Sequence, residues 1–202
     1  MANLPSIAQW GRHLKRFSGN LITVTNPMDI NNYILWKYSG IEKNRCIGFG
    51  GQLDSARFII ELEKLKVSDA SWVLGEHGEH QVPVFSSLTQ KIPLNIRENL
   101  LMNLRGSSMQ VIHGKTGTVF GPALHISQLV EAIINDKRQI LPCSCILDGE
   151  YGIHDCSLGV PAKIGREGIL DIVEMPLDDW ESQKLSEAGK FVQSLCRHEF
   201  IA

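Results

Sequence analysis

Residues 21–49 read LITVTNPMDINNYILWKYSGIEKNRCIGF, a stretch with two short apolar runs and a helical pattern between them. LITVT (21–25) and RCIGF (45–49) have the length and the apolar, partly β-branched composition of buried parallel strands. Asn26, followed by a proline, ends the first strand, and the next helix continues to Tyr38. This alternation predicts parallel strands that are joined by a right-handed crossover.

The segments on either side of this stretch extend the same pattern. An amphipathic helix is predicted over residues 4–17, and a further helix from about Leu53 to Leu65 follows the second strand. The order β-α-β-α places these residues in a short parallel α/β part of the chain.

The pattern changes after Ser68. Helices are predicted near 95–112 and 120–135, whereas strand-like runs otherwise follow one another directly, which favours antiparallel pairing. These runs are SWVLG (71–75), QVPVF, ILPCSCILD, YGIHDCSLGV, VPAKIG and ILDIVEM. A last helix is predicted from about Asp179 to His198, and Asp178 with Glu181 resembles a capping box at its start. The chain therefore reads as a short parallel α/β part and then a larger mixed α+β part.

The composition describes an ordinary globular protein of 202 residues. Its 20 Lys and Arg nearly balance its 22 Asp and Glu, for a net charge of −2, and 43% of the residues are hydrophobic. This balance argues against a nucleic-acid or membrane-surface binder. No apolar run is long enough for a transmembrane helix, and the first residues lack the apolar core of a signal peptide. We therefore expect a cytoplasmic protein.

The five cysteines are interpreted as reduced, buried residues. They are scattered and odd in number, which does not suit a disulfide framework. Cys143 and Cys145 lie on one face of a predicted strand, but no second close pair completes a zinc site. No metal site is predicted.

Candidate catalytic residues occur at a helix start, in a turn and at a strand end. Asp54 and Arg57 share one helix face, where an ordinary ion pair is the alternative interpretation. His77 follows an apolar strand between two glycines, a place suited to acid–base chemistry, although a surface-loop histidine is the simpler reading. Asn26 ends the first strand, where ligands bind in parallel sheets, and its alternative role is that of a turn residue.

Two glycine-containing motifs do not fit nucleotide-binding patterns. GFGG (48–51) resembles a dinucleotide loop, but Leu53 stands where its third glycine should be. GKT (114–116) resembles a phosphate loop, but Met109 stands where its first glycine should be. His77 and His80 form an HxxH pair, but no further carboxylate or cysteine motif completes a metal site.

Together the candidate residues suit the oxidation of a 2-hydroxy acid. His77 can take the hydroxyl proton, Asp54 can orient the imidazole, and Arg57 can hold the substrate carboxylate with a two-point fork. Protein side chains do not accept a hydride, so this chemistry implies a nicotinamide cofactor.

At these residues the sequence resembles the lactate/malate dehydrogenase family, and it is most similar to the lactate-dehydrogenase-like malate dehydrogenases of archaea and bacteria. The matching segments span nearly the whole chain in the family's order. They are VTNPMD (24–29), GFGGQLDSARF (48–58), GEHGE (75–79), KTGTVFGPA (115–123) and LDGEYGIHDCSLGVPAKIGREGI (147–169).

The resemblance assigns roles to individual residues. His77 is similar to the catalytic proton acceptor, Asp54 to its orienting carboxylate and Arg57 to the clamp for the substrate carboxylate. Further positions carry binding roles in the family: Asn26 for substrate and nicotinamide, Val24 and Thr25 for the cofactor, and Thr118 for the substrate side of the pocket.

The family's first nucleotide-binding elements have no counterpart in this sequence. Its GxGxxG turn, its ribose-binding acidic residue and its arginine-bearing mobile loop are absent. The resemblance implies that residues 1–46 are the C-terminal remnant of a dinucleotide-binding domain and 47–202 the catalytic substrate domain. The expected fold class is α/β, a remnant of a Rossmann-type parallel sheet followed by a mixed, largely antiparallel α+β domain.

Three functional interpretations follow. The first is a malate dehydrogenase of the tricarboxylic acid cycle, which interconverts (S)-malate and oxaloacetate with NAD; NADP is the alternative cofactor and lactate the alternative substrate. The second is a truncated or repurposed, non-catalytic oligomerising module, and the third is one half of a split dehydrogenase. The resemblance also implies a homo-oligomer, a dimer or a tetramer. The near-neutral charge, together with the lack of a long apolar run, predicts no nucleic-acid or membrane partner.

Overall fold

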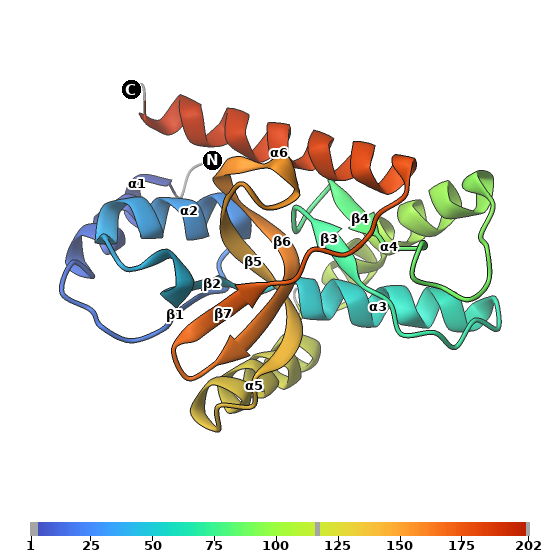
Figure 1. Ribbon diagram of the computed structural model, residues 1–202, viewed down its shortest axis with the longest axis horizontal. Helices are drawn as coiled ribbons and strands as arrows, with labels where there is room; N and C mark the ends of the chain where they lie inside the picture. The colour runs from blue at the N-terminus through green and yellow to red at the C-terminus, as the bar shows by residue number, and fades with distance from the viewer. Residues whose placement is uncertain (1–3, 116–117, 201–202) are drawn as a thin grey trace.

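A single seven-stranded sheet organises the molecule, which the computed structural model describes over residues 4–115 and 118–200 (Figure 1). The strand order is β1-β2-β5-β6-β3-β4, and β7 pairs with β6. The strands are β1 (Leu21–Thr23), β2 (Cys46–Gly48), β3 (Val73–Gly75), β4 (Gln81–Pro83), β5 (Gln139–Asp148), β6 (His154–Gly165) and β7 (Gly168–Ile172). The α-helices are α1 (Leu4–His13), α2 (Met28–Ser39), α3 (Gly51–Lys64), α4 (Leu94–Lys115), α5 (Phe120–Ile134) and α6 (Asp179–Phe200), with short 3-10 turns at Lys43–Arg45 and Glu150–Gly152.

The parallel part of the sheet confirms the predicted β-α-β order. β1 and β2 are parallel, and α2 connects them. The first strand is shorter than the LITVT run because it ends at Thr23, and residues 24–27 form an exposed connection to α2. The first helix likewise ends at His13 rather than at residue 17.

The antiparallel part confirms the expected pairing and corrects one boundary. β5, β6 and β7 pair antiparallel in chain order. The runs YGIHDCSLGV and VPAKIG, which the sequence suggests as separate strands, form the single strand β6. A proline has no backbone N–H to donate, but Pro161 lies opposite Pro142 in the register and the ladder continues on both sides of that pair.

Helices cover both sides of the long β5–β6 ribbon. In Figure 1, α6 runs along one side of it and α5 lies on the opposite side. The larger hydrophobic core fills the space around the central strands, and a second cluster around Phe58, Leu62 and Leu104 joins α3, β3 and α4. α3, which carries Asp54 and Arg57, is thereby packed against β3, and His77 lies just beyond the end of β3.

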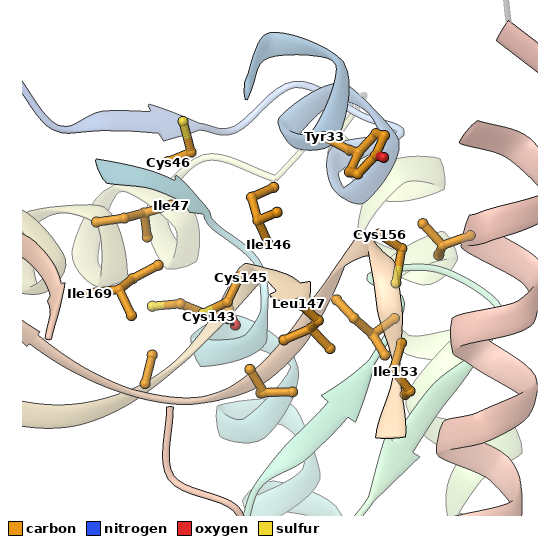
Figure 2. Close-up of a cluster of buried hydrophobic side chains, with 14 of the residues drawn as sticks. Tyr33, Cys46, Ile47, Cys143, Cys145, Ile146, Leu147, Ile153, Cys156 and Ile169 are labelled. Atoms are coloured by element: carbon orange, nitrogen blue, oxygen red, sulfur yellow. Dashed lines mark hydrogen bonds between the residues drawn. The ribbon is translucent and has the colours of Figure 1, made fainter. Parts of the chain in front are cut away.

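All five cysteines are free and buried, as predicted from their number and spacing. Figure 2 shows Cys143, Cys145 and Cys156 among the apolar side chains of the central strands. Burial raises the pKa of the Cys143 and Cys156 thiols to about 12, so both stay protonated at neutral pH. Among the described residues, no group of His, Cys, Asp and Glu is arranged to hold a metal ion.

The capping box predicted for the last helix is present. The Glu181 N–H donates to Asp178 Oδ1 and the Asp178 N–H donates to Glu181 Oε2, each at 3.0 Å. None of the helices that the structure describes is both long and apolar enough to cross a membrane.

Candidate active site

His77 lies in a tight turn between β3 and β4. The turn closes through the Glu76 N–H, which donates to the His80 carbonyl at 3.2 Å. Gly75 has a φ of +88°, and a Cβ at this position would lie 2.4 Å from the same carbonyl oxygen. A glycine is therefore required where the chain leaves β3, and this local geometry places His77 just beyond the strand end.

Asp54 holds the His77 ring. It lies in the first turn of α3, its side chain is 3% exposed, and its Oδ2 is 2.5 Å from His77 Nδ1. A carboxylate on Nδ1 fixes the orientation of the ring and leaves Nε2 as the nitrogen that can exchange a proton with a ligand. This pair confirms that the helix start and the turn, distant in sequence, meet in the fold.

The pKa of His77 is raised above its ordinary value. Burial of the ring opposes protonation, but the negative charge of Asp54 and its hydrogen bond outweigh that effect. The charge of Asp29 raises the pKa further, whereas the positive charge of Arg57 lowers it. His77 is therefore tuned toward the protonated form by carboxylates on two different helices.

Arg57 lies next to this pair, one helical turn after Asp54. Its Nη1 is 3.4 Å from Asp54 Oδ1, and its side chain is 15% exposed. A guanidinium group beside the imidazole supplies the planar, two-point contact that a carboxylate ligand needs. The structure thus brings together His77, Asp54 and Arg57.

Asp29 and Gly50 also fix the position of His77. Its backbone N–H donates to Asp29 Oδ2 at 2.7 Å, and Asp29 is 2% exposed at the start of α2. Gly50 presents its bare backbone to the ring, because a Cβ there would lie 2.6 Å from His77 Cγ. Neither residue is predicted as a site residue from the sequence. Asp29 lies in the VTNPMD segment and Gly50 in GFGG, but nothing local in either pattern names His77 as the partner.

Val24, Thr25 and Asn26 lie on the exposed connection between β1 and α2. Asn31 Nδ2 donates to the Thr25 carbonyl at 2.8 Å, which ties this connection to the helix that carries Asp29. The position at the carboxyl end of a parallel strand is as predicted, but no direct contact joins Asn26 to His77, Asp54 or Arg57 among the described interactions. Their binding roles remain predictions.

Thr118 lies between α4 and α5 and is partly exposed. No described contact joins it to the His77–Asp54–Arg57 group, so its predicted role in substrate binding is not tested by the geometry.

The buried acid–imidazole pair and the adjacent arginine can together exchange a proton with a ligand and hold its carboxylate. The family model for the lactate/malate dehydrogenase α/β C-terminal domain matches residues 51–196. The chain belongs to this family, as its sequence motifs indicate.

Relatives with the names malate dehydrogenase and lactate dehydrogenase match most of the chain. The malate dehydrogenase of Natronomonas pharaonis is 39% identical over 199 residues, covering 93% of this chain and 66% of its own length. L-lactate dehydrogenase 1 of Enterococcus faecalis is 35% identical and covers 91% of this chain and 62% of its own length. The chain thus spans somewhat less than two thirds of the length of these relatives.

Solved structures of the family share the fold. The malate dehydrogenase of Archaeoglobus fulgidus, solved in complex with NADH, superposes with a TM-score of 0.87 at 32% identity, over 97% of this chain and 67% of that one. The malate dehydrogenase of Aeropyrum pernix gives the same TM-score and identity. These likenesses confirm the expected fold class.

Proposed function

We propose that the chain carries the catalytic residues of a malate dehydrogenase, which reversibly oxidises (S)-malate to oxaloacetate. The single observation that supports this most strongly is the 2.5 Å contact between His77 Nδ1 and Asp54, beside Arg57. The similarity to malate dehydrogenases, at 38–40% identity in three haloarchaeal relatives, supports malate over lactate as the substrate.

The reaction follows from these residues. Arg57 binds a carboxylate of the substrate and orients it toward the imidazole. His77, neutral at Nε2, takes the proton of the substrate hydroxyl while the C–O single bond becomes a carbonyl. The imidazolium that forms is stabilised by the Asp54 carboxylate. In the reverse direction the protonated His77 returns the proton to the carbonyl oxygen.

The hydride that leaves the substrate carbon is accepted by a nicotinamide cofactor when that cofactor is bound. The exposed Val24 side chain and the polar Asn26, at the carboxyl end of β1, fit a planar ring that carries an amide. We propose that residues 24–26 contact the nicotinamide end and that the cofactor is NAD, as the NADH complex of the Archaeoglobus enzyme suggests. Thr118 is proposed to line the substrate side.

The proposed organisation follows the same resemblance. Residues 1–46 correspond to the end of a nucleotide-binding domain and 47–202 to the substrate domain, a division supported by the start of the family match at Gly51. A homo-oligomer is proposed, supported by large exposed apolar side chains at the start of α5, such as Phe120 and Leu124. Light scattering after size-exclusion chromatography tests the oligomeric state.

Turnover of malate with NAD by the purified chain, followed by NADH absorbance, tests the function. We expect His77→Asn to lower the rate by at least about a hundredfold. His154 provides a matched control because it also lies near an aspartate, Asp148, but its side chain is 58% exposed. Equal activities for His77→Asn and wild type would refute the assigned role of His77.

A further inference from the structure

A buried polar network lies beneath the proposed base and ends at Asp29. α2 is buried on most of its surface, yet its first turns place Asp29, Asn31 and Asn32 in the interior, each at most 2% exposed. Buried polar groups are costly unless each finds a partner. The hydrogen-bond partners of these three side chains therefore show which segments α2 fixes in position.

The hydrogen bonds of the network have one consistent direction. Thr23 Oγ1 donates to Asn32 Oδ1 at 2.9 Å, and Asn32 Nδ2 donates to Ser157 Oγ at 2.9 Å. Ser157 Oγ and Ser144 Oγ are 2.7 Å apart, and the Ser144 hydroxyl donates to Asp29 Oδ1 at 2.5 Å. With Ser157 as the donor to Ser144, every donor points toward Asp29, which is the arrangement that favours an ionised carboxylate at the end of the chain.

The second carboxylate oxygen of Asp29 binds the turn that carries His77. While Oδ1 accepts from Ser144 on β5, Oδ2 accepts the backbone N–H of His77. The neighbouring Asn31 holds the Thr25 carbonyl in the segment proposed to meet the cofactor. One turn of α2 therefore ties both parts of the proposed site to the central strands.

We propose that Asp29 is a positioning residue for His77: it anchors the peptide that carries the base, and its negative charge favours the protonated imidazole. Asp54 controls the ring, whereas Asp29 controls the backbone beneath it. The inference rests on the proposed role of His77, but the contacts that support it are independent of turnover.

Several charged groups act on the two residues. Asp54 and Arg57 face His77 from α3, Asp29 faces it from α2, and Glu76 of the same turn adds a negative charge near Asp29. Burial raises the pKa of Asp29 to about 7, against the hydrogen bonds from Ser144 and His77, which lower it. Asp29 is hydrogen-bonded to the backbone of His77, so the charge of one group affects the protonation of the other.

NMR titration of the His77 imidazole in the 202-residue chain tests the proposal, with Asp29→Asn as the main variant. Asparagine keeps an acceptor for the His77 N–H and a polar group beside Ser144, but it has no charge, so the pKa of His77 should fall. Asp171→Asn removes the same charge from an exposed position on β7 and should leave the His77 pKa unchanged. A His77 pKa equal in Asp29→Asn and wild type would overturn the electrostatic role.

Two further variants separate anchoring from charge. Asp29→Ala removes the acceptor, so exchange of the His77 amide hydrogen should become about tenfold faster or more. Ser144→Ala removes one donor to Asp29, which favours its neutral form and should also lower the His77 pKa. This milder change keeps the proposal testable if Asp29 variants do not fold: an unchanged His77 pKa in Ser144→Ala would then count against it.

These readouts distinguish the inference from the proposed function. If the His77 pKa falls in Asp29→Asn while the wild-type chain oxidises no malate, the positioning role stands and the proposed activity fails. If malate is oxidised but neither the pKa nor the amide exchange responds to Asp29, the activity stands and the inference fails.

Discussion

Three neighbours at the starts of two helices, α2 and α3, fix the position of His77. Asp54 holds the ring nitrogen, Asp29 holds the backbone N–H, and Gly50 leaves the ring the space that a Cβ would occupy. Catalysis that depends on proton transfer is sensitive to displacements of about 1 Å. A small change at any of these contacts should therefore reduce activity without disturbing the rest of the fold.

Gly50 lies where a side chain would collide with the His77 ring. In Gly50→Ala, the new methyl group would lie 2.6 Å from His77 Cγ, so the ring or the backbone that carries the methyl group must shift, which disturbs the contact with Asp54. We expect malate oxidation to fall by at least about tenfold, and the downfield proton resonance of the Asp54–His77 hydrogen bond to be lost.

Gly106 on α4 is the matched control for this substitution. A Cβ at Gly106 has no neighbour within 4 Å, and Gly→Ala inside a helix is worth up to about 1 kcal/mol of stability. Gly106→Ala should thus be as active as wild type. A Gly50→Ala protein that keeps both full activity and the resonance would show that the ring does not depend on this glycine.

The carboxylate of Asp54 should control how the rate of malate oxidation depends on pH. Asp54 is the main cause that raises the pKa of His77, so Asp54→Asn should lower this pKa. Malate oxidation requires the neutral imidazole, and the wild-type rate should rise as the pH increases through the raised pKa. In Asp54→Asn that rise should occur at lower pH, with a maximal rate reduced by roughly a hundredfold or more.

Rate profiles from acid to alkaline pH for wild type and Asp54→Asn measure this shift. Oxaloacetate reduction requires the protonated imidazole, so its rate should change with pH in the opposite direction. A variant profile with the same midpoint as wild type would mean that Asp54 does not control the protonation of His77.

The sequence could predict the chemically distinctive part of this site but not its support. His77, Asp54 and Arg57 are conspicuous because of their residue types and their places at a turn and a helix start. Asp29 depends on a partner 48 residues away, and Ser144 on one 115 residues away. Such contacts are set by tertiary packing, and a buried aspartate or serine leaves no periodic signal in the sequence.

At the scale of elements, the start of α6 is a junction rather than a simple cap. Glu181 is fully buried, and besides the capping box its Oε1 accepts the backbone N–H groups of Phe85 at 2.6 Å and Ser86 at 2.8 Å. Arg97 Nη1 lies 3.9 Å from the same carboxylate. One side chain thus joins α6 to the segment after β4 and to α4.

Glu181→Ala should therefore destabilise the protein much more than the loss of a cap. It leaves several buried donors and Arg97 without this acceptor, and we expect the free energy of unfolding to fall by about 2–4 kcal/mol. Urea denaturation followed by circular dichroism measures the effect. Glu187→Ala on the exposed side of the same helix should change it by less than about 0.5 kcal/mol, and equal losses for both would contradict the junction.

Element boundaries show where local patterns are sufficient. The strands and helices of the parallel part occur in the predicted order because each has its own apolar period, although β1 and α1 end earlier than predicted. The split of β6 into two runs was wrong, since the pairing of Pro161 with Pro142 is visible only when two strands lie side by side. The capping box is local, and its prediction is confirmed, but the contacts of Glu181 to the segment after β4 are not local.

At the scale of the whole molecule, the buried carboxylate of Asp29 affects stability as well as the proposed site. Its pKa rises from 3.8 to about 7 on folding, mainly because burial disfavours the charged form. The folded state therefore binds this proton more tightly than the unfolded chain does. The contribution of Asp29 to stability is greatest at low pH and declines as the pH rises toward 7.

Asp29→Asn cannot titrate and should lack this decline. The difference in unfolding free energy, wild type minus Asp29→Asn, should become smaller from about pH 4 to about pH 7. Urea denaturation at several pH values in this range measures it. Asp136 gives the opposite case, because the Arg166 N–H and Arg138 lower its pKa, so its stabilising effect is lost as the pH falls. The corresponding difference for Asp136→Asn should therefore decrease toward low pH. If the Asp29 difference stays constant or grows with pH, Asp29 is charged in the folded state throughout this range, and its hydrogen bonds from Ser144 and His77 outweigh its burial.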